Sequence, residues 1–364
     1  MSDEQPSTPG PARPALRRPV VVVGAVVVLV VAAVLVVVRL GGDDDERGRL
    51  ERAVAFTPRD SQRILWTDWA GVRDELGADL GADPSAAEVQ DLLDRGFESD
   101  LTSTSALGSS AVAMQERLGF SPATLEWELY TQSESGAALV LQLADGVSTD
   151  DVTDRLAGLG YAEPTDDDGY WVLGTDAPFS TEITPELVYL TFDDDAGLVI
   201  AGDNAAGPAE ARESVRAASS EPVPDGVVAQ LGAPLSAAIF TGSYACSALA
   251  MGNADDRDRA AADDLVAQAG EIDPLTGFGM GVEPGGSVRV TMGFETEAQA
   301  RTNADTRARL ATGPAPGQGG DFADRFALAK ASAEGSVVVL DLDPVDGAYV
   351  VSDLSSGPVL FATC

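Results

Sequence analysis

The sequence predicts an α+β fold, with a single N-terminal transmembrane helix followed by an ectodomain of two strand-and-helix modules with mostly antiparallel sheets. Three observations lead to this fold class. An uncharged apolar run fills residues 20–38. After it, helical segments alternate with runs of two or three strand-like segments, an order typical of α+β proteins. Finally, residues 136–159 and 286–310 both place an apolar strand, an acid and a Thr-capped helix in succession, which suggests an internal duplication.

The apolar run Val20–Val38 is long enough to be a membrane anchor. A helix rises about 1.5 Å per residue, so this segment can cross a hydrocarbon core of roughly 30 Å. Arg13, Arg17 and Arg18 precede it, and acidic residues follow it. Because arginine on a short flank favours the cytoplasm, we expect the N-terminus inside and the ectodomain outside. Residues 19–40 would then be a single-pass anchor in the cytoplasmic membrane, with the lipid bilayer as partner.

A cleaved secretory signal is the main alternative to an anchor. Such a signal has a shorter apolar region, about 7–15 residues, and a small-x-small cleavage site. The run here is longer and ends in Val-Val-Val-Arg-Leu, and no Cys lies near it for lipoprotein processing. We therefore expect an uncleaved signal anchor between a disordered cytoplasmic tail (residues 1–18) and a short charged tether (residues 41–49).

The acidic composition limits the partners. The 364 residues are 45% hydrophobic and have a formal net charge of −36. Residues 1–38 contribute +1, so residues 39–364 carry −37. Such a domain repels nucleic acid and anionic lipid headgroups and attracts cations. We expect no nucleic acid as partner, and an envelope protein or a basic partner fits the charge. The plainer interpretation is that the acid keeps an exported domain soluble.

The two cysteines, Cys246 and Cys364, are predicted to form a disulfide. An exported domain works in an oxidising compartment, where an even number of cysteines suggests pairing. If a strand ends near each residue, adjacent strands would bring the two sulfurs together. Two buried free thiols are the alternative.

The first predicted module covers residues 50–220. Its elements follow from apolar periodicity and from helix caps such as Asp68 and Ser148. The expected strands are 54–56, 63–66, 124–131, 136–143, 170–173, 187–192 and 197–201, and the expected helices are 67–77, 85–95, 109–118, 148–160 and 208–218. The segment SSEPVPDG, residues 219–226, is the expected joint to the second module.

The second predicted module covers residues 221–364. Its expected strands are 236–241, 277–282, 287–294, 337–342, 349–354 and 358–364, and its expected helices are 254–269, 296–310 and 322–333. The strand 277–282 has a Gly at every second position, which leaves one face bare. A dinucleotide-binding motif would need its third Gly where Pro284 stands, so a structural role is favoured.

The sequence resembles a known family. The segments ALVLQL, DDVTDRLAGLGY, GYWVLG, GLVIAGD and AEARESV are similar to bacterial exported, N-terminally membrane-anchored proteins with an uncharacterised domain of unknown function. The resemblance covers residues about 50–245. It consists of strand and helix segments rather than reactive residues, so it implies export and anchoring but no catalytic position.

Several kinds of chemistry are excluded by composition and motif. The chain has no His, which removes Ser-His-Asp and Cys-His sites, His general bases and the usual zinc ligand sets. No G-x-S-x-G motif is present, and Lys330 follows Ala329 rather than Gly, so there is no P-loop. We therefore expect no cofactor.

Acidic clusters remain as candidate sites. Residues 166–168 and 193–195 stand before glycines and are expected in turns, and the acids of 255–258 are expected at a helix start. Residues 341–347, DLDPVDG, resemble a calcium loop, but one residue is inserted and Ser352 stands where the EF-hand Glu belongs. The sequence nominates no metal-binding or catalytic residue.

Two functional hypotheses follow. The preferred one is a non-enzymatic, membrane-anchored extracytoplasmic ectodomain that binds an envelope protein or another partner. The alternative is a carboxylate-dependent hydrolase of cell-envelope glycans. That activity would need a deep cleft containing two close acids with raised pKa values.

Overall fold

The computed structural model describes residues 48–166, 168–217 and 225–364. The predicted tail, the predicted anchor and most of the tether (residues 1–47) lie outside these ranges, as does most of the predicted joint 219–226. Among the described residues, no helix combines the length and the apolar character needed to cross a bilayer.

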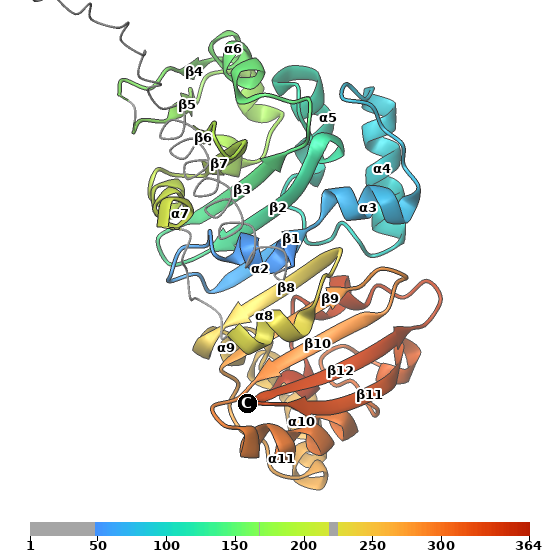
Figure 1. The fold of residues 1–364 in the computed structure, drawn as a ribbon. Helices are drawn as coiled ribbons and strands as arrows, with labels where there is room; N and C mark the ends of the chain where they lie inside the picture. Colours follow the sequence, from blue (N-terminus) through green and yellow to red (C-terminus); the bar gives the residue numbers. More distant parts are fainter. Residues whose placement is uncertain (1–47, 167, 218–224) are drawn as a thin grey trace, which may run out of the picture. The chain divides into compact units, whose positions relative to one another are not determined.

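Within the described residues, twelve strands form one antiparallel sheet in the order β11-β12-β10-β9-β8-β1-β2-β3-β7-β6-β5-β4 (Figure 1). The strands are β1 (Arg63–Thr67), β2 (Leu125–Gln132), β3 (Ala137–Leu143), β4 (Tyr161–Ala162), β5 (Trp171–Leu173), β6 (Tyr189–Asp193), β7 (Leu198–Gly202), β8 (Ser236–Thr241), β9 (Gly277–Val282), β10 (Val288–Gly293), β11 (Phe326–Glu334) and β12 (Val337–Pro344). The predicted α+β class with antiparallel pairing is confirmed. Strands of both predicted modules share this sheet through the β1–β8 pair, and the module boundary at residue 220 stays a prediction.

The two halves of the sheet have the same connectivity. Outward from β1 the order is β1-β2-β3-β7-β6, and outward from β8 it is β8-β9-β10-β12-β11. In each half a single helix, α6 (Thr149–Leu159) or α11 (Glu297–Leu310), follows the third strand counted outward. The later strands of that half then lie in reverse chain order, so that the last one, β7 or β12, pairs with that third strand. The first half adds β4 and β5 at its outer edge. This arrangement agrees with the internal duplication that the repeated sequence pattern suggests.

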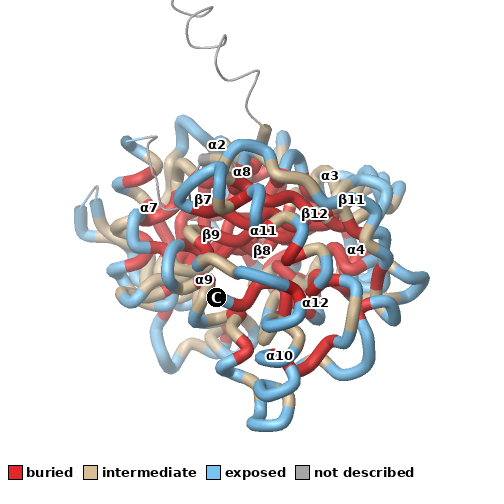
Figure 2. Tube along the Cα trace, turned by 90° about the horizontal axis from the view of Figure 1, so that it is seen from below, coloured by how far each residue is buried: buried red, intermediate tan, exposed pale blue. Residues whose placement is uncertain are grey.

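Helices cover both faces of the sheet. The larger layer contains α3 (Trp69–Leu76), α4 (Ala86–Glu98), α5 (Ala111–Ala113), α6, α9 (Gly242–Leu249), α10 (Asp256–Ala269), α11 and α12 (Val350–Leu354). The smaller layer on the opposite face contains α2 (Arg49–Val54), α7 (Ala206–Ala217) and α8 (Asp225–Leu231). Figure 2 shows the buried residues concentrated on the strands between these layers.

Because both faces are covered, the central strands are buried on both sides. Successive side chains of a strand point to opposite faces. In β1, Leu65 therefore packs into the larger helix layer, whereas Ile64 and Trp66 pack into the smaller one. The near-continuous apolar run of β3 has the same cause.

The predicted bare glycine face of β9 is confirmed. Phe278 and Met280 belong to the larger core, and Gly279 on the opposite face lies against Leu231 and Val227 of α8. A Cβ at Gly279 would lie 2.7 Å from Thr291 Oγ1 and 3.4 Å from a Leu231 methyl carbon. The helix can approach the sheet this closely only because Gly279 has no side chain.

Most predicted elements are present with ends that differ by a few residues, but three strand predictions and one helix prediction are wrong. The expected strand 54–56 is the end of α2, where Leu50, Ala53 and Val54 meet the core at helical spacing. The expected strand 349–354 is α12, whose apolar residues Val350, Val351 and Leu354 also repeat with a helical period. Both segments are too short for their periodicity to be distinguished from a strand run.

The expected helix 322–333 is also wrong, because residues 326–334 form the edge strand β11. Its alanines favour a helix locally, but its backbone pairs with β12 across a turn in which Gly335 has φ +59°. The expected strand 358–364 contains a 3₁₀ turn, Leu360–Ala362, instead. Helices α8 and α9 were not predicted.

Candidate functional site

A cleft of about 330 Å³ lies between the two halves of the described structure. The first half contributes the C-terminal ends of α3 and α4. The second half contributes the β9–β10 turn and the loop that follows β12. The cleft therefore exists only because the halves share one sheet.

The cleft is acidic and has apolar walls. Its carboxylates are Glu75, Glu98, Asp100 and Asp346, and its lining contains no Arg or Lys. The apolar lining residues are Leu76, Leu101, Leu235, Val282, Val288, Pro344, Val345 and Ala348. This combination places negative charge beside partly exposed apolar side chains, of which Val345 is the most exposed.

Two exposed hydrophobic side chains accompany the cleft. Phe97 is 55% exposed and Val345 is 44% exposed, and these are the exposed large hydrophobic residues of the described ranges. Val345 lines the cleft, and Phe97 precedes the lining residue Glu98. The ring of Phe97 lies 5.3 Å from that of Tyr349, which joins the two halves at this edge.

Asp100 fixes one half of the described structure to the other. It has φ +55°, a left-handed conformation that Asp tolerates better than most residues. Its carboxylate accepts hydrogen bonds from the backbone N–H of Val351 (2.7 Å) and of Ser352 (3.1 Å) in α12. Burial raises the pKa of Asp100 to about 6, although these hydrogen bonds act in the opposite direction.

A second carboxylate also spans the halves at the cleft. Glu75, at the end of α3, accepts a hydrogen bond of 3.1 Å from the backbone N–H of Gly285 in the β9–β10 turn. Gly285 has φ +85°, so the turn depends on a glycine at this position. The two carboxylate bridges hold the cleft walls in place.

Glu128 is buried in β2, away from the cleft lining. Its carboxylate accepts hydrogen bonds from Trp69 Nε1 (3.0 Å), Ser105 Oγ (2.7 Å) and the backbone N–H of Ala106 (2.7 Å). Burial raises the pKa of Glu128 to about 7, whereas the three hydrogen bonds lower it. With all three donors belonging to α3 and to the loop after α4, Glu128 orders this part of the core.

The free energy of unfolding is expected to decrease as the pH rises from about 4.5 to about 7. The folded-state pKa values of Asp100 and Glu128 are raised, so across this window the folded protein holds protons that the unfolded chain has released. At about 1.4 kcal/mol per pKa unit, Glu128 accounts for roughly 3 kcal/mol. Urea unfolding at pH 5 and at pH 7.5 measures the effect.

The Glu128→Gln variant should flatten this pH dependence, because the substituted side chain cannot ionise. Replacement of the exposed Glu134 by Gln provides a control with the same change of charge. An equally steep pH dependence in Glu128→Gln and in the control would contradict the assignment.

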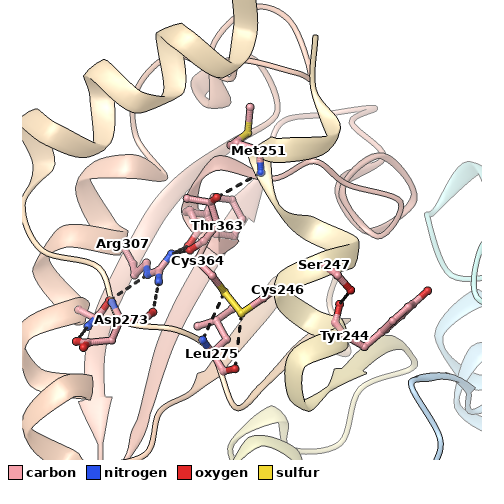
Figure 3. The surroundings of a disulfide bond; sticks show 11 residues. Tyr244, Cys246, Ser247, Met251, Asp273, Leu275, Arg307, Thr363 and Cys364 are labelled. Atoms are coloured by element: carbon pink, nitrogen blue, oxygen red, sulfur yellow. Dashed lines mark hydrogen bonds between the residues drawn. A yellow bond between two sulfur atoms is a disulfide. The ribbon is translucent and has the colours of Figure 1, made fainter. Parts of the chain in front are cut away.

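The predicted disulfide between Cys246 and Cys364 is present, with 5.5 Å between the Cα atoms (Figure 3). Cys246 lies in α9 and Cys364 follows a 3₁₀ turn, so the predicted route through adjacent strands is wrong. Cys364 Sγ accepts a hydrogen bond of 3.5 Å from the backbone N–H of Leu275.

Arg307 is buried beside this disulfide and was not predicted. Its guanidinium donates to the backbone carbonyls of Phe361 (3.1 Å), Thr363 and Asp273 (2.8 Å), and to Asn303 Oδ1 (3.2 Å) (Figure 3). Burial lowers the pKa of Arg307 to about 10, so it stays charged at neutral pH. Arg307 and the disulfide together fix the C-terminal segment.

The acidic clusters singled out from the sequence lie mainly in turns and caps. Residues 193–195 lead from β6 into the turn before β7, and Asp255 caps α10 by accepting from two backbone N–H groups. In 341–347, Asp341 pairs with Arg289 at 2.9 Å, whereas Asp346 lines the cleft. In the described ranges, no group of three or more Cys, Asp or Glu side chains is arranged to hold a metal ion.

Comparisons with known proteins give a distant likeness. No family model matches the chain, and no curated protein matches it. Among solved structures, crystal forms I and III of TP0453 are similar, with TM-scores of 0.39 and 0.40 and sequence identities of 8% and 9%. The alignments cover 85% and 83% of this chain and 97% of that chain.

Proposed function

We propose that the protein is a membrane-anchored extracytoplasmic protein whose ectodomain binds an envelope protein in the cleft between its halves, without catalysing a reaction. The observation that carries the proposal is the cleft itself. It joins four carboxylates and the exposed Val345 in one lining, and the exposed Phe97 lies next to it, against Tyr349. Exposed hydrophobic residues that are gathered at one concave surface are typical of interaction sites.

The geometry favours binding over carboxylate-dependent hydrolysis. A glycoside hydrolase needs two facing carboxyl groups about 5–10 Å apart, one of them available as an acid. In the cleft, the buried Asp100 is occupied by two backbone N–H groups of α12. The other strongly buried acid, Glu128, lies outside the cleft and is fully hydrogen-bonded.

The proposed location rests on the sequence and is supported by the disulfide. The run Val20–Val38 with its preceding arginines would hold the chain in the cytoplasmic membrane. The Cys246–Cys364 bond is of the kind that persists in oxidising compartments. A tether of residues 41–49 would keep the ectodomain close to the outer membrane surface.

A reporter fusion tests this location. A reporter that works only in the cytoplasm, fused after Cys364, should be inactive, and one that works only after export should be active. Removing residues 1–40 should reverse both results, because the segment that directs export is then missing. Activity of the cytoplasmic reporter in the full-length fusion would overturn the proposed location.

A further inference from the structure

Extending the proposed function, we propose that the cleft binds a basic peptide segment in which Lys or Arg side chains alternate with apolar ones. The inference rests on the proposed function for its biological setting, but its chemistry comes from the cleft alone. The partner is identified by two properties of the lining, its charge and its apolar surface.

The first property is uncompensated negative charge. Glu98 and Asp346 are exposed, and Glu75 uses one oxygen for the Gly285 N–H. Arg95 and Arg325, on neighbouring elements, form their ion pairs with acids outside the cleft lining. Arg95 pairs with Asp91 and donates to the Leu76 carbonyl, and Arg325 pairs with Asp353 and donates to loop carbonyls. A cationic partner therefore meets carboxylates that no cation of the cleft lining neutralises.

The second property is the apolar surface beneath and beside the charges. Leu101, Leu235, Val282 and Val288 line the cleft but are almost fully buried, so the accessible apolar surface comes from partly exposed lining residues, above all Val345, which is 44% exposed. Phe97, which lies next to the lining, is half exposed and available for contact. Lys and Arg side chains have apolar stems, and a neighbouring Leu or Val can pack on such walls. A purely ionic ligand would leave this surface in water.

The same observations disfavour other occupants. The described acids do not gather into a group that could hold a metal ion. Nucleic acid and anionic lipid would meet the negative charge of the cleft and of the −37 ectodomain. A second copy of the ectodomain carries the same negative charge, so it is repelled as well. A basic polypeptide is the partner whose charge and side chains complement the cleft.

Peptide binding to the full-length chain tests the proposal. The protein is placed in phosphatidylcholine nanodiscs, and fluorescence anisotropy follows the labelled peptides KLKLKL, KSKSKS and ELELEL, with empty nanodiscs as background. We expect KLKLKL to bind, KSKSKS to bind about fivefold more weakly, and ELELEL to show no binding. Affinity for KLKLKL should fall as salt is raised, because exposed charges are screened.

Matched variants locate the binding. The triple variant Glu75→Gln, Glu98→Gln, Asp346→Asn should weaken KLKLKL binding at least about tenfold, while the amide that replaces the Glu75 carboxylate keeps an acceptor for the Gly285 N–H. The control Asp154→Asn, Asp263→Asn, Asp264→Asn removes the same charge from exposed positions on α6 and α10 and should bind as the unmodified chain does. In addition, Phe97→Ser should weaken KLKLKL binding and leave KSKSKS unaffected.

Several results would overturn the inference: no binding of KLKLKL, equal binding of KSKSKS, or the same loss in the control variant as in the cleft variant. The last result would mean that the total charge attracts the peptide without the cleft. None of these results depends on which side of the membrane the ectodomain occupies. Failure here therefore leaves the proposed location standing, and an active cytoplasmic reporter would leave peptide binding standing.

Discussion

Replacing Arg307 by alanine is expected to lower the free energy of unfolding by about 3–5 kcal/mol, because this buried, charged side chain makes the hydrogen bonds that hold two chain segments together. The guanidinium satisfies carbonyls on two separate segments, Asp273 before β9 and Phe361 and Thr363 near the C-terminus. Alanine would leave these buried acceptors without a partner and would leave a cavity beside Phe294. Urea unfolding of the purified protein measures the change.

Arg301→Ala is the matched control for this prediction. Arg301 lies on the same helix, α11, and forms an exposed i,i+4 pair with Glu297. Pairs of this kind contribute about 0.3–0.5 kcal/mol, so the control should unfold almost as the unmodified chain does. Arg307→Lys should lie between the two, because a single ammonium cannot reproduce the planar fork. Equal stability of Arg307→Ala and Arg301→Ala would show that the buried hydrogen bonds contribute nothing.

Much of the secondary structure could be predicted because the local signals are strong. Thr296 caps α11 through a capping box with Gln299, and the predicted bounds of β8 and β9 agree with the structure. The failed helix prediction, 322–333, lies where tertiary pairing overrides local preference. The Ala-rich segment 326–334 is a strand because β12 provides its hydrogen-bond partners, and no property of the segment alone reveals that partner.

The candidate site was less predictable than the fold. The disulfide could be expected, since the chain has two cysteines and export to an oxidising compartment is predicted. The cleft could not be, because its lining comes from α3, α4, the β9–β10 turn and the loop after β12. Glu128 also escaped prediction. Its place on an alternating strand indicates a solvent-facing acid, and only the helix layer that brings Trp69 and the Ser105 loop over it makes it a buried acceptor.

The sequence contains a sign of the buried role of Arg307, but that sign does not distinguish it from the other arginines of α11. Arg307 lies four residues after Asn303, and both side chains face the core of the second half. On the sequence, however, α11 carries three arginines, Arg301, Arg307 and Arg309, with nothing local to separate the buried one from the others. What decides its role is the C-terminal segment, which lies more than fifty residues away in the chain.

Reducing the Cys246–Cys364 bond is expected to lower the free energy of unfolding by up to about 5 kcal/mol, because the bond spans 118 residues and constrains the unfolded chain. The loss of order should be local to the second half. Cys246 lies in α9, and the C-terminal segment contacts α9, the segment before β9 and α11 through Val359, Cys364 and Arg307. Hydrogen exchange followed by mass spectrometry should show faster exchange in α9, α11 and residues 358–364, with β1–β3 and α3–α4 changed less.

The Cys246→Ser, Cys364→Ser variant separates the bond from the reductant. It should exchange as the reduced chain does, and adding reductant to it should have no further effect. The bond itself is checked by alkylating the non-reduced protein before mass spectrometry, which should leave both cysteines unmodified. Two alkylated cysteines, or a cross-linked dimer in place of an internal bond, would contradict the pairing. An equal increase of hydrogen exchange in both halves after reduction would instead mean that the loss of order spreads through the shared sheet, because β1 and β8 are hydrogen-bonded neighbours.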